Sequence, residues 1–179
     1  ARQFPFAYDP MEQIDLVPYQ TAVFGADQPH VEGWIRDIWQ PGSVTGTMDF
    51  LDALNQRIAT EISYIVRDEP GVQSPARTVS RGKGSCRDVA TLFIEACRSC
   101  GLASRFVSGY LVSSAAVEDL ATTHAWAEVY LPGTGWRGFD STGGQLVGGD
   151  HIAVAVHRHP EAIPPVSGSF IGPTELKPI

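Results

Sequence analysis

The 179-residue sequence contains only three cysteines, and no stretch of it approaches the roughly 20 apolar residues of a membrane span. A small, odd number of cysteines does not suggest a disulfide scaffold. The chain carries 13 Lys and Arg against 20 Asp and Glu, without a dense basic run. The resulting net charge of -7 argues against a surface built for phosphate backbones. We therefore expect a soluble protein whose partner is neither nucleic acid nor a membrane.

The amino terminus also lacks a charged region followed by an apolar core, as a secretory signal would have. We therefore expect a cytoplasmic location. Because the chain begins Ala1-Arg2 without an initiator Met, an additional amino-terminal domain absent from this sequence is compatible with it. Residues 1–28 are rich in Pro, Gln, Asp and aromatic residues without a sustained period, which predicts an extended arm or linker. The hydrophobic content of 43% suffices for a single domain over residues 29–179.

Within that domain, helical patterns come first and strand patterns follow. Apolar residues at helical spacing predict helices over residues 30–40, 47–65 and 86–101, with a loop over residues 66–84 that contains a helical turn near residues 77–81. Alternating patterns predict strands over residues 104–112, 124–131, 136–140, 151–156 and 166–171, and residues 113–122 form a loop. This order predicts an α+β fold with an antiparallel sheet.

Cys86 follows a Gly-rich turn and opens the third predicted helix. Ser85 is a good N-cap and Asp88 stands three residues later, which is an Asp variant of the capping-box spacing. The unpaired N–H groups and the dipole at a helix N-terminus favour a thiolate over a thiol. Cys86 is therefore a candidate nucleophile that requires a histidine base from elsewhere in the chain.

Cys97 and Cys100 form a Cys-x-x-Cys pair, a spacing that also occurs in metal and redox sites. No second pair or histidine cluster accompanies them, and they end a helix instead of beginning one. Both fall on the apolar stripe of the Cys86 helix, and a rise of 1.5 Å per residue separates Cys97 from Cys86 by about 16 Å. We expect both to be structural.

His124 and Asp140 are the candidate partners of Cys86, and the loop between their strands decides whether they meet. A loop of two or four residues would direct Asp140 away from the face that carries His124. A three-residue loop over residues 132–134 pairs Leu131 with Gly135 and places Asp140 diagonal to His124, roughly 7 Å apart along the backbones. A five-residue loop could also bring Asp140 and His124 to the same face of the sheet. The hypothesis that Asp140 orients His124 thus requires an odd loop or a compensating bulge.

Five blocks of the sequence, in order, resemble the microbial transglutaminase-like superfamily of papain-like proteases and amidases. They are Gly84–Asp88, Ala96–Arg105, Val107–Tyr110, His124–Tyr130 and Gly135–Thr142, within a match over about residues 62–142. The resemblance implies a bacterial catalytic domain with a papain-like core, in which the cysteine helix packs against an antiparallel sheet. By position, Cys86 matches the nucleophile, His124 the general base and acid, and Asp140 the residue that orients the imidazole.

The activity implied by this resemblance is covalent acyl transfer on a peptide or protein amide through a thioester, without a cofactor or metal. Hydrolysis is the first expectation because water is always available, and a crosslinking transamidase or a non-catalytic interaction module are the alternatives. Three further residues are candidates for the site. Tyr64 is a candidate second oxyanion donor, and Tyr110 and Trp126 are candidates for lining the site. We expect His151, His157 and His159, in a Pro-rich region, to be exposed structural residues and not metal ligands.

Overall fold

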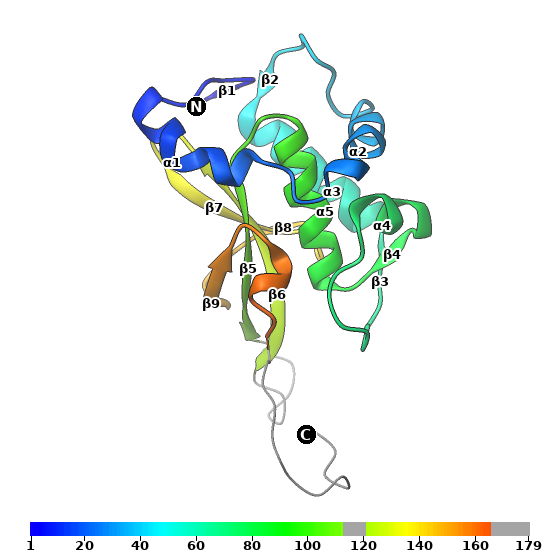
Figure 1. Ribbon diagram of the computed structural model, residues 1–179. Coiled ribbons are helices and arrows are strands. Elements are labelled where there is room, and N and C mark those ends of the chain that lie inside the picture. The colour runs from blue at the N-terminus through cyan, green and yellow to red at the C-terminus, as the bar shows by residue number, and fades with distance from the viewer. Residues whose placement is uncertain (113–120, 166–179) are drawn as a thin grey trace, which may run out of the picture.

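The structure, a computed structural model, describes residues 1–112 and 121–165. Its centre is a five-stranded antiparallel sheet in the order β8-β7-β6-β5-β9 (Figure 1). The strands are β5 (Ser104–Val112), β6 (Ala121–Leu131), β7 (Gly135–Asp140), β8 (Gln145–Leu146) and β9 (His151–His157). Two short pairs lie outside this sheet: β1 (Gln3–Phe4) with β2 (Thr45–Gly46), and β3 (Ser63–Tyr64) with β4 (Lys83–Gly84).

Most helices gather on one side of the sheet, where α5 contacts β6 and β5 (Figure 1). The helices are α1 (Pro10–Gln20), α2 (Gln28–Ile35), α3 (Thr47–Glu61), α4 (Pro75–Arg81) and α5 (Cys86–Ser99), with short 3-10 turns at Gly25–Asp27 and Pro160–Ala162. The main core is formed by apolar side chains of α2, α3 and α5 together with Ala125, Ala127 and Val129 of β6. The predicted α+β fold, with the cysteine helix packed on an antiparallel sheet, is confirmed. Among the described residues, no helix is both long and apolar enough to span a bilayer.

The prediction that residues 1–28 form an extended arm was wrong. Asp9 accepts a hydrogen bond from the N–H of Met11 at 2.9 Å and starts α1, with Pro10 as its first residue. Phe4 belongs to the main core, and Leu16 of α1 is buried in a second cluster that includes Tyr130 and Trp136. This segment is therefore packed against the rest of the described structure.

A buried ion pair on α5 holds the chain after α1 in place. Glu95 and Arg98 lie 2.7 Å apart with side chains that are almost completely buried. Glu95 also accepts hydrogen bonds from the backbone N–H groups of Val23 and Phe24, while Arg98 donates to the carbonyl of Tyr19. Because a buried charge is tolerated only when it is paired and hydrogen-bonded, these contacts explain why the amino-terminal segment docks onto α5.

The other predicted elements differ from the structure mainly at their ends. The helix predicted over residues 47–65 ends at Glu61, because Ser63–Tyr64 are extended and pair with Lys83–Gly84. The helical turn near residues 77–81 belongs to α4, which begins at Pro75. The predicted strand over residues 166–171 and most of the predicted loop over residues 113–122 lie outside the described residues.

The hairpin between β6 and β7 has the register that an odd loop requires. Leu131 pairs with Gly135 across the three-residue turn of residues 132–134, and Ala127 pairs with Phe139. Ala127 and Phe139 both lie in the main core. Because side chains alternate along a strand, Asp140 and the even-numbered residues of β6 share the opposite face.

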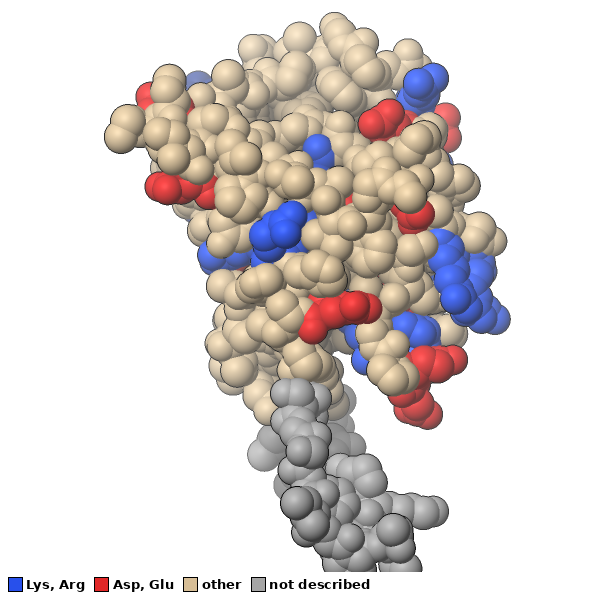
Figure 2. Space-filling model, viewed as in Figure 1, with Lys and Arg blue, Asp and Glu red and all other residues tan. Residues whose placement is uncertain are grey.

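On the face of the molecule seen in Figure 2, basic and acidic side chains are interspersed.

Candidate active site

Cys86 is the first residue of α5, and a buried carboxylate fixes the turn that precedes it. Asp88 accepts hydrogen bonds from the N–H and the hydroxyl of Ser85 at 2.8 and 2.9 Å. The backbone N–H of Gln73 donates to the same carboxylate at 2.7 Å, and Arg67 forms an ion pair with it at 2.8 Å. The predicted helix start at Cys86 and the interaction between Ser85 and Asp88 are both confirmed.

These contacts keep Asp88 ionised. Burial alone raises the pKa of Asp88, but the hydrogen bonds from Gln73 and Ser85 and the charge of Arg67 outweigh it and leave the pKa below its usual value. The ionised carboxylate in the first turn of α5 is also favourably placed at the positive end of the helix dipole. The start of the helix that carries Cys86 is thus fixed by a buried network.

His124 of β6 contacts Asp140 at the end of β7. The Nε2 atom of His124 lies 2.8 Å from Oδ2 of Asp140, and both side chains are largely buried. The N–H of Thr142 donates to Oδ1 of Asp140 at 2.9 Å, which fixes the other end of the carboxylate. Because Nε2 is engaged by Asp140, the Nδ1 atom of His124 remains to interact with Cys86.

The charges of these groups reinforce one another. Burial lowers the pKa of His124, but its hydrogen bonds to Asp140 and to the Cys86 side chain outweigh burial and raise the pKa to about 9. Burial raises the pKa of Asp140, whereas the hydrogen bond and charge of His124 lower it to about 2. His124 thus lies between the Cys86 side chain and an ionised carboxylate, and its imidazolium form is stabilised by both.

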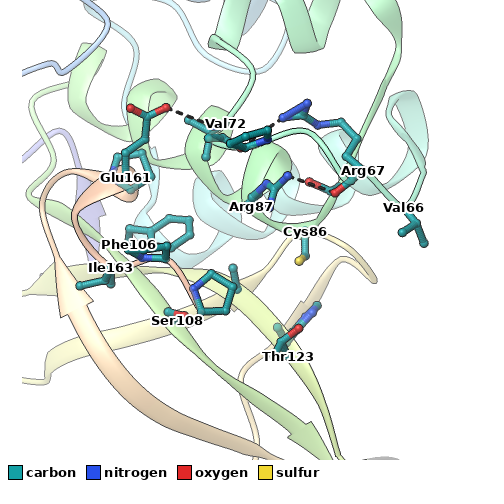
Figure 3. Close-up of a pocket in the computed structure, with 18 of the residues that line it drawn as sticks. Val66, Arg67, Val72, Cys86, Arg87, Phe106, Ser108, Thr123, Glu161 and Ile163 are labelled. Atoms are coloured by element: carbon teal, nitrogen blue, oxygen red, sulfur yellow. Dashed lines mark hydrogen bonds between the residues drawn. The ribbon is translucent and has the colours of Figure 1, made fainter. Parts of the chain in front are cut away.

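Cys86 and His124 line a cavity of about 500 Å³ (Figure 3). Figure 3 shows the Cys86 sulfur directed into the cavity on the side where Thr123 lies. One wall comes from the loop between β3 and α4, and another from β5, β6 and the segment after β9. The labelled lining residues in Figure 3 are Val66, Arg67, Val72, Cys86, Arg87, Phe106, Ser108, Thr123, Glu161 and Ile163.

A hydrogen bond joins two walls of this cavity. Glu161, in the 3-10 turn after β9, accepts from the N–H of Val72 at 3.3 Å. The apolar side chains of Val72, Phe106 and Ile163 lie on the walls, and Arg87 stands directly beside Cys86 in the sequence. The cavity therefore presents a thiol and an imidazole within a largely apolar pocket that carries a few charged groups, as small-molecule and peptide sites commonly do.

Of the three further candidates from the sequence, Tyr64, Tyr110 and Trp126, one lines the cavity and two do not. Tyr64 lines the cavity, and the raised pKa of its phenol arises first from burial and then from the nearby Cys86. Tyr110 is partly exposed on β5, and Trp126 is 1% exposed beneath the site; neither is among the residues that line the cavity. Trp126 instead packs near the His124 ring, with centroids 6.3 Å apart.

His151 was predicted to be exposed, and this was wrong. Its side chain is completely buried, and its Nε2 atom lies 3.2 Å from Oδ2 of Asp140. His124, Asp140 and His151 together offer three potential metal-ligand atoms within 4.8 Å of one another. His151 follows a Gly-rich turn at residues 148–149, and no hydrophobic period marks it as buried. Its contact with Asp140 depends on the placement of β9 beside β5.

Cys97 and Cys100 lie away from the cavity. Cys97 is fully buried in the main core, where burial raises its pKa far above the usual value. Burial also raises the pKa of Cys100, to about 11. The structural role predicted for this pair agrees with their positions, and neither thiol is suited to act as a nucleophile near neutral pH.

Comparison with known proteins places the chain within a family. The model of the transglutaminase-like superfamily matches residues 37–141, more than half of the chain. An uncharacterized protein of Mycobacterium tuberculosis is 33% identical over 138 residues, which cover 68% of this chain and 41% of that protein. An uncharacterized protein of Mycobacterium leprae is 32% identical over 96 residues, covering 50% of this chain and 33% of that one. The chain thus spans less than half the length of these relatives.

Solved structures share the fold at lower identity. A structure from Cytophaga hutchinsonii, named "Putative Cysteine Protease", has a TM-score of 0.68 and 23% identity, covering 84% of this chain and 50% of that one. The periplasmic domain of TgpA from Pseudomonas aeruginosa has a TM-score of 0.55 and 20% identity, over 77% and 49% of the two chains. LapG from Legionella pneumophila has a TM-score of 0.54 and 14% identity, over 85% and 86%.

Proposed function

The chain belongs to the transglutaminase-like superfamily, and we propose that it catalyses acyl transfer on amide bonds with Cys86 as nucleophile, His124 as general acid and base, and Asp140 as the residue that orients His124. The observation that carries this proposal is the hydrogen bond of 2.8 Å between His124 and Asp140. His124 lines the same cavity as Cys86, which is the first residue of α5. A nucleophile, a base and a group that orients the base are the components of covalent acyl transfer.

In the first half-reaction, the Cys86 thiolate attacks the carbonyl carbon of the amide, and the C–S bond forms as the carbonyl electrons move to oxygen. We expect the backbone N–H of Cys86, which is free of intrahelical partners at the start of α5, to donate to the resulting oxyanion. The Nδ1 proton of the His124 imidazolium then passes to the nitrogen of the leaving amine as the C–N bond breaks. The product is a thioester on Cys86 and a free amine.

In the second half-reaction, His124 is neutral and acts as a base. Its Nδ1 atom accepts a proton from the incoming water or amine, which attacks the thioester carbonyl. The C–S bond breaks and restores the Cys86 thiolate beside the imidazolium. Water yields a carboxylic acid, and an amine yields a new amide.

Hydrolysis is the reaction we propose first, because water reaches any open cavity whereas transamidation requires a bound amine. The substrate class we propose is a peptide or isopeptide, since the apolar side chains of Val72, Phe106 and Ile163 line the same cavity as Cys86 and can accept apolar side chains of such a substrate. The Cytophaga hutchinsonii structure named as a cysteine protease is in line with this choice.

A panel of peptides and isopeptides, incubated with the protein with and without an added primary amine and analysed by mass spectrometry, tests this proposal. A product acid that depends on Cys86 supports hydrolysis, and incorporation of the amine identifies a transamidase instead. Thiol alkylation provides the companion measurement. Slow, equal labelling of Cys86, Cys97 and Cys100, together with no turnover, would identify a non-catalytic module and contradict the proposal.

A further inference from the structure

His151, the first residue of β9, brings a second imidazole to the carboxylate that contacts His124. Its Nε2 atom lies 3.2 Å from Oδ2 of Asp140, the same oxygen that lies 2.8 Å from Nε2 of His124. The His151 side chain has no exposed surface, although β9 is an edge strand among the described residues. A buried polar ring must find its partners within the protein, so these partners indicate its role.

The second ring nitrogen of His151 contacts another carboxylate. Nδ1 lies 2.7 Å from Oδ1 of Asp150, while the N–H of Gly148 lies 3.4 Å from the same nitrogen. An ionised carboxylate only accepts hydrogen bonds, so each of the two short contacts requires a proton on the ring. The contact with Asp150 is by far the shorter of the two at Nδ1, and we assign both ring nitrogens of His151 as donors.

Trp126 fixes the two imidazoles relative to each other. The His151 ring meets the Trp126 indole edge to face with centroids 5.2 Å apart, and the His124 ring lies 6.3 Å from the same indole. Space for the indole exists because the neighbouring residue on β5 is Gly109, where a Cβ atom would lie 2.7 Å from the Trp126 ring. Both imidazoles thus pack against one buried side chain and meet at one carboxylate oxygen.

We propose that His151 is a positioning residue of the site, which holds the Asp140 carboxylate in place for His124 and is itself held by Asp150. The inference rests on the proposed function, because it assigns His151 to the same Cys86-His124-Asp140 arrangement. Asp140 is the last residue of β7 and is buried, so hydrogen bonds from its neighbours orient its carboxylate. Thr142 fixes Oδ1, and the two histidines fix Oδ2 from different strands.

The same three side chains could instead hold a divalent cation, since their ligand atoms lie close together. The hydrogen-bond interpretation is favoured because both histidine contacts with Asp140 have hydrogen-bond lengths, and because Asp150 occupies the other nitrogen of His151. A bound metal would have to displace the protons in the contacts between these rings and Asp140. Metal content is therefore one of the outcomes that the experiment distinguishes.

A double-mutant cycle in the full chain tests the inference, with the rate of Cys86 alkylation by iodoacetate at neutral pH as the readout. We expect His151→Phe, which keeps a planar ring but donates no hydrogen bond, to slow alkylation about fivefold or more, and His151→Gln to restore part of the loss. In an Asp140→Asn background, His151→Phe should have no further effect. The matched control is His157→Gln, which removes an exposed histidine from the same strand and should leave the rate unchanged.

The inference would be overturned if His151→Phe alkylated at the wild-type rate. It would also be overturned if His151→Phe slowed alkylation by the same factor in the Asp140→Asn background as in the wild type. NMR of wild-type protein with labelled histidine nitrogens gives a readout that does not depend on how a variant folds. The spectra should show a hydrogen-bonded proton on each ring nitrogen of His151, as the contacts with Asp140 and Asp150 require. An unprotonated nitrogen at His151, or stoichiometric zinc in the purified protein, would also contradict it.

These outcomes separate the inference from the proposed function. Alkylation and NMR need no substrate, so a protein that shows the expected cycle but cleaves no amide would contradict the proposed function alone. An active enzyme in which His151→Phe alkylates at the wild-type rate would contradict the role of His151 alone.

Discussion

The Nε2 atom of His124 lies 2.8 Å from Oδ2 of Asp140, although 16 residues separate them in the chain. A three-residue turn brings them together, because it pairs Leu131 with Gly135 and thereby places Asp140 on the face that carries His124. A loop with one residue more or fewer would direct Asp140 into the core that Phe139 occupies. The chemistry proposed for the site therefore depends on the length of one hairpin loop.

The protonation of His124 predicts a pH-dependent preference between two alkylating reagents. Its pKa is raised to about 9, so the imidazolium persists below that pH and is lost as the pH rises through it. Iodoacetate carries a carboxylate that the imidazolium attracts, whereas iodoacetamide is neutral. The ratio of their alkylation rates at Cys86 should therefore fall as the pH rises through about 9. A ratio that stays constant over this range would contradict the proximity of His124 and Cys86.

Replacing Asp140 should impair catalysis without removing the nucleophile. Asp140→Asn takes away the ionised partner that raises the pKa of His124, so the fall in the reagent ratio should move to lower pH. Amide turnover should decrease by about two to four orders of magnitude, as expected when a base loses its orienting carboxylate.

Asp52→Asn, at an exposed position of α3, is the matched control for Asp140→Asn and should leave both measurements unchanged. Wild-type turnover by Asp140→Asn would show that His124 needs no orienting carboxylate.

The buried pair of Glu95 and Arg98 should be important for stability. Glu95→Ala leaves the Arg98 charge buried without its partner and removes the acceptor of two backbone N–H groups, so the free energy of unfolding should fall by about 3 to 5 kcal/mol. Asp37→Ala removes an exposed partner of Arg57 and should cost about 1 kcal/mol or less. Urea unfolding followed by circular dichroism measures both values, and equal costs would contradict the anchoring role of Glu95.

Gly109 should not tolerate a side chain. A Cβ atom there would lie 2.2 Å from the carbonyl oxygen of Ile152 on β9 and 2.7 Å from the Trp126 ring, so Gly109→Ala must displace β9 or the indole. We expect loss of stability and slower alkylation of Cys86. Gly33→Ala, in α2, meets nothing within 4 Å and should stabilise the protein by about 0.5 to 1 kcal/mol. Thermal unfolding distinguishes the two, and a neutral Gly109→Ala would contradict the close packing at this point.

Local chemistry made the central part of the site predictable. Ser85 and Asp88 define where α5 begins, and the Pro132-Gly133 turn fixes the hairpin that carries His124 and Asp140. The helix start depends on residues close together in sequence, so capping rules suffice to predict it. Alternation alone left the register of the hairpin dependent on the length of its loop, and the structure has the three-residue loop that brings Asp140 to His124.

The features missed by sequence reasoning depend on contacts between distant segments. The apolar residues of α1 form no buried stripe, because Met11, Ile14 and Val17 are exposed and only Leu16 is buried. The helix is held instead by packing and by the network around Glu95, which no local pattern indicates. His151 was missed for a similar reason, since its contact with Asp140 exists only once β9 pairs with β5.

Trapping the intermediate shows directly whether Cys86 forms a thioester with an amide substrate. Protein mixed with a substrate from the peptide panel is quenched in acid at early times and analysed by intact-protein and peptide mass spectrometry. We expect an acyl group on the peptide that contains Cys86, sensitive to hydroxylamine and absent from Cys86→Ala. Turnover that persists in Cys86→Ala, or an acyl group on a different residue, would contradict it.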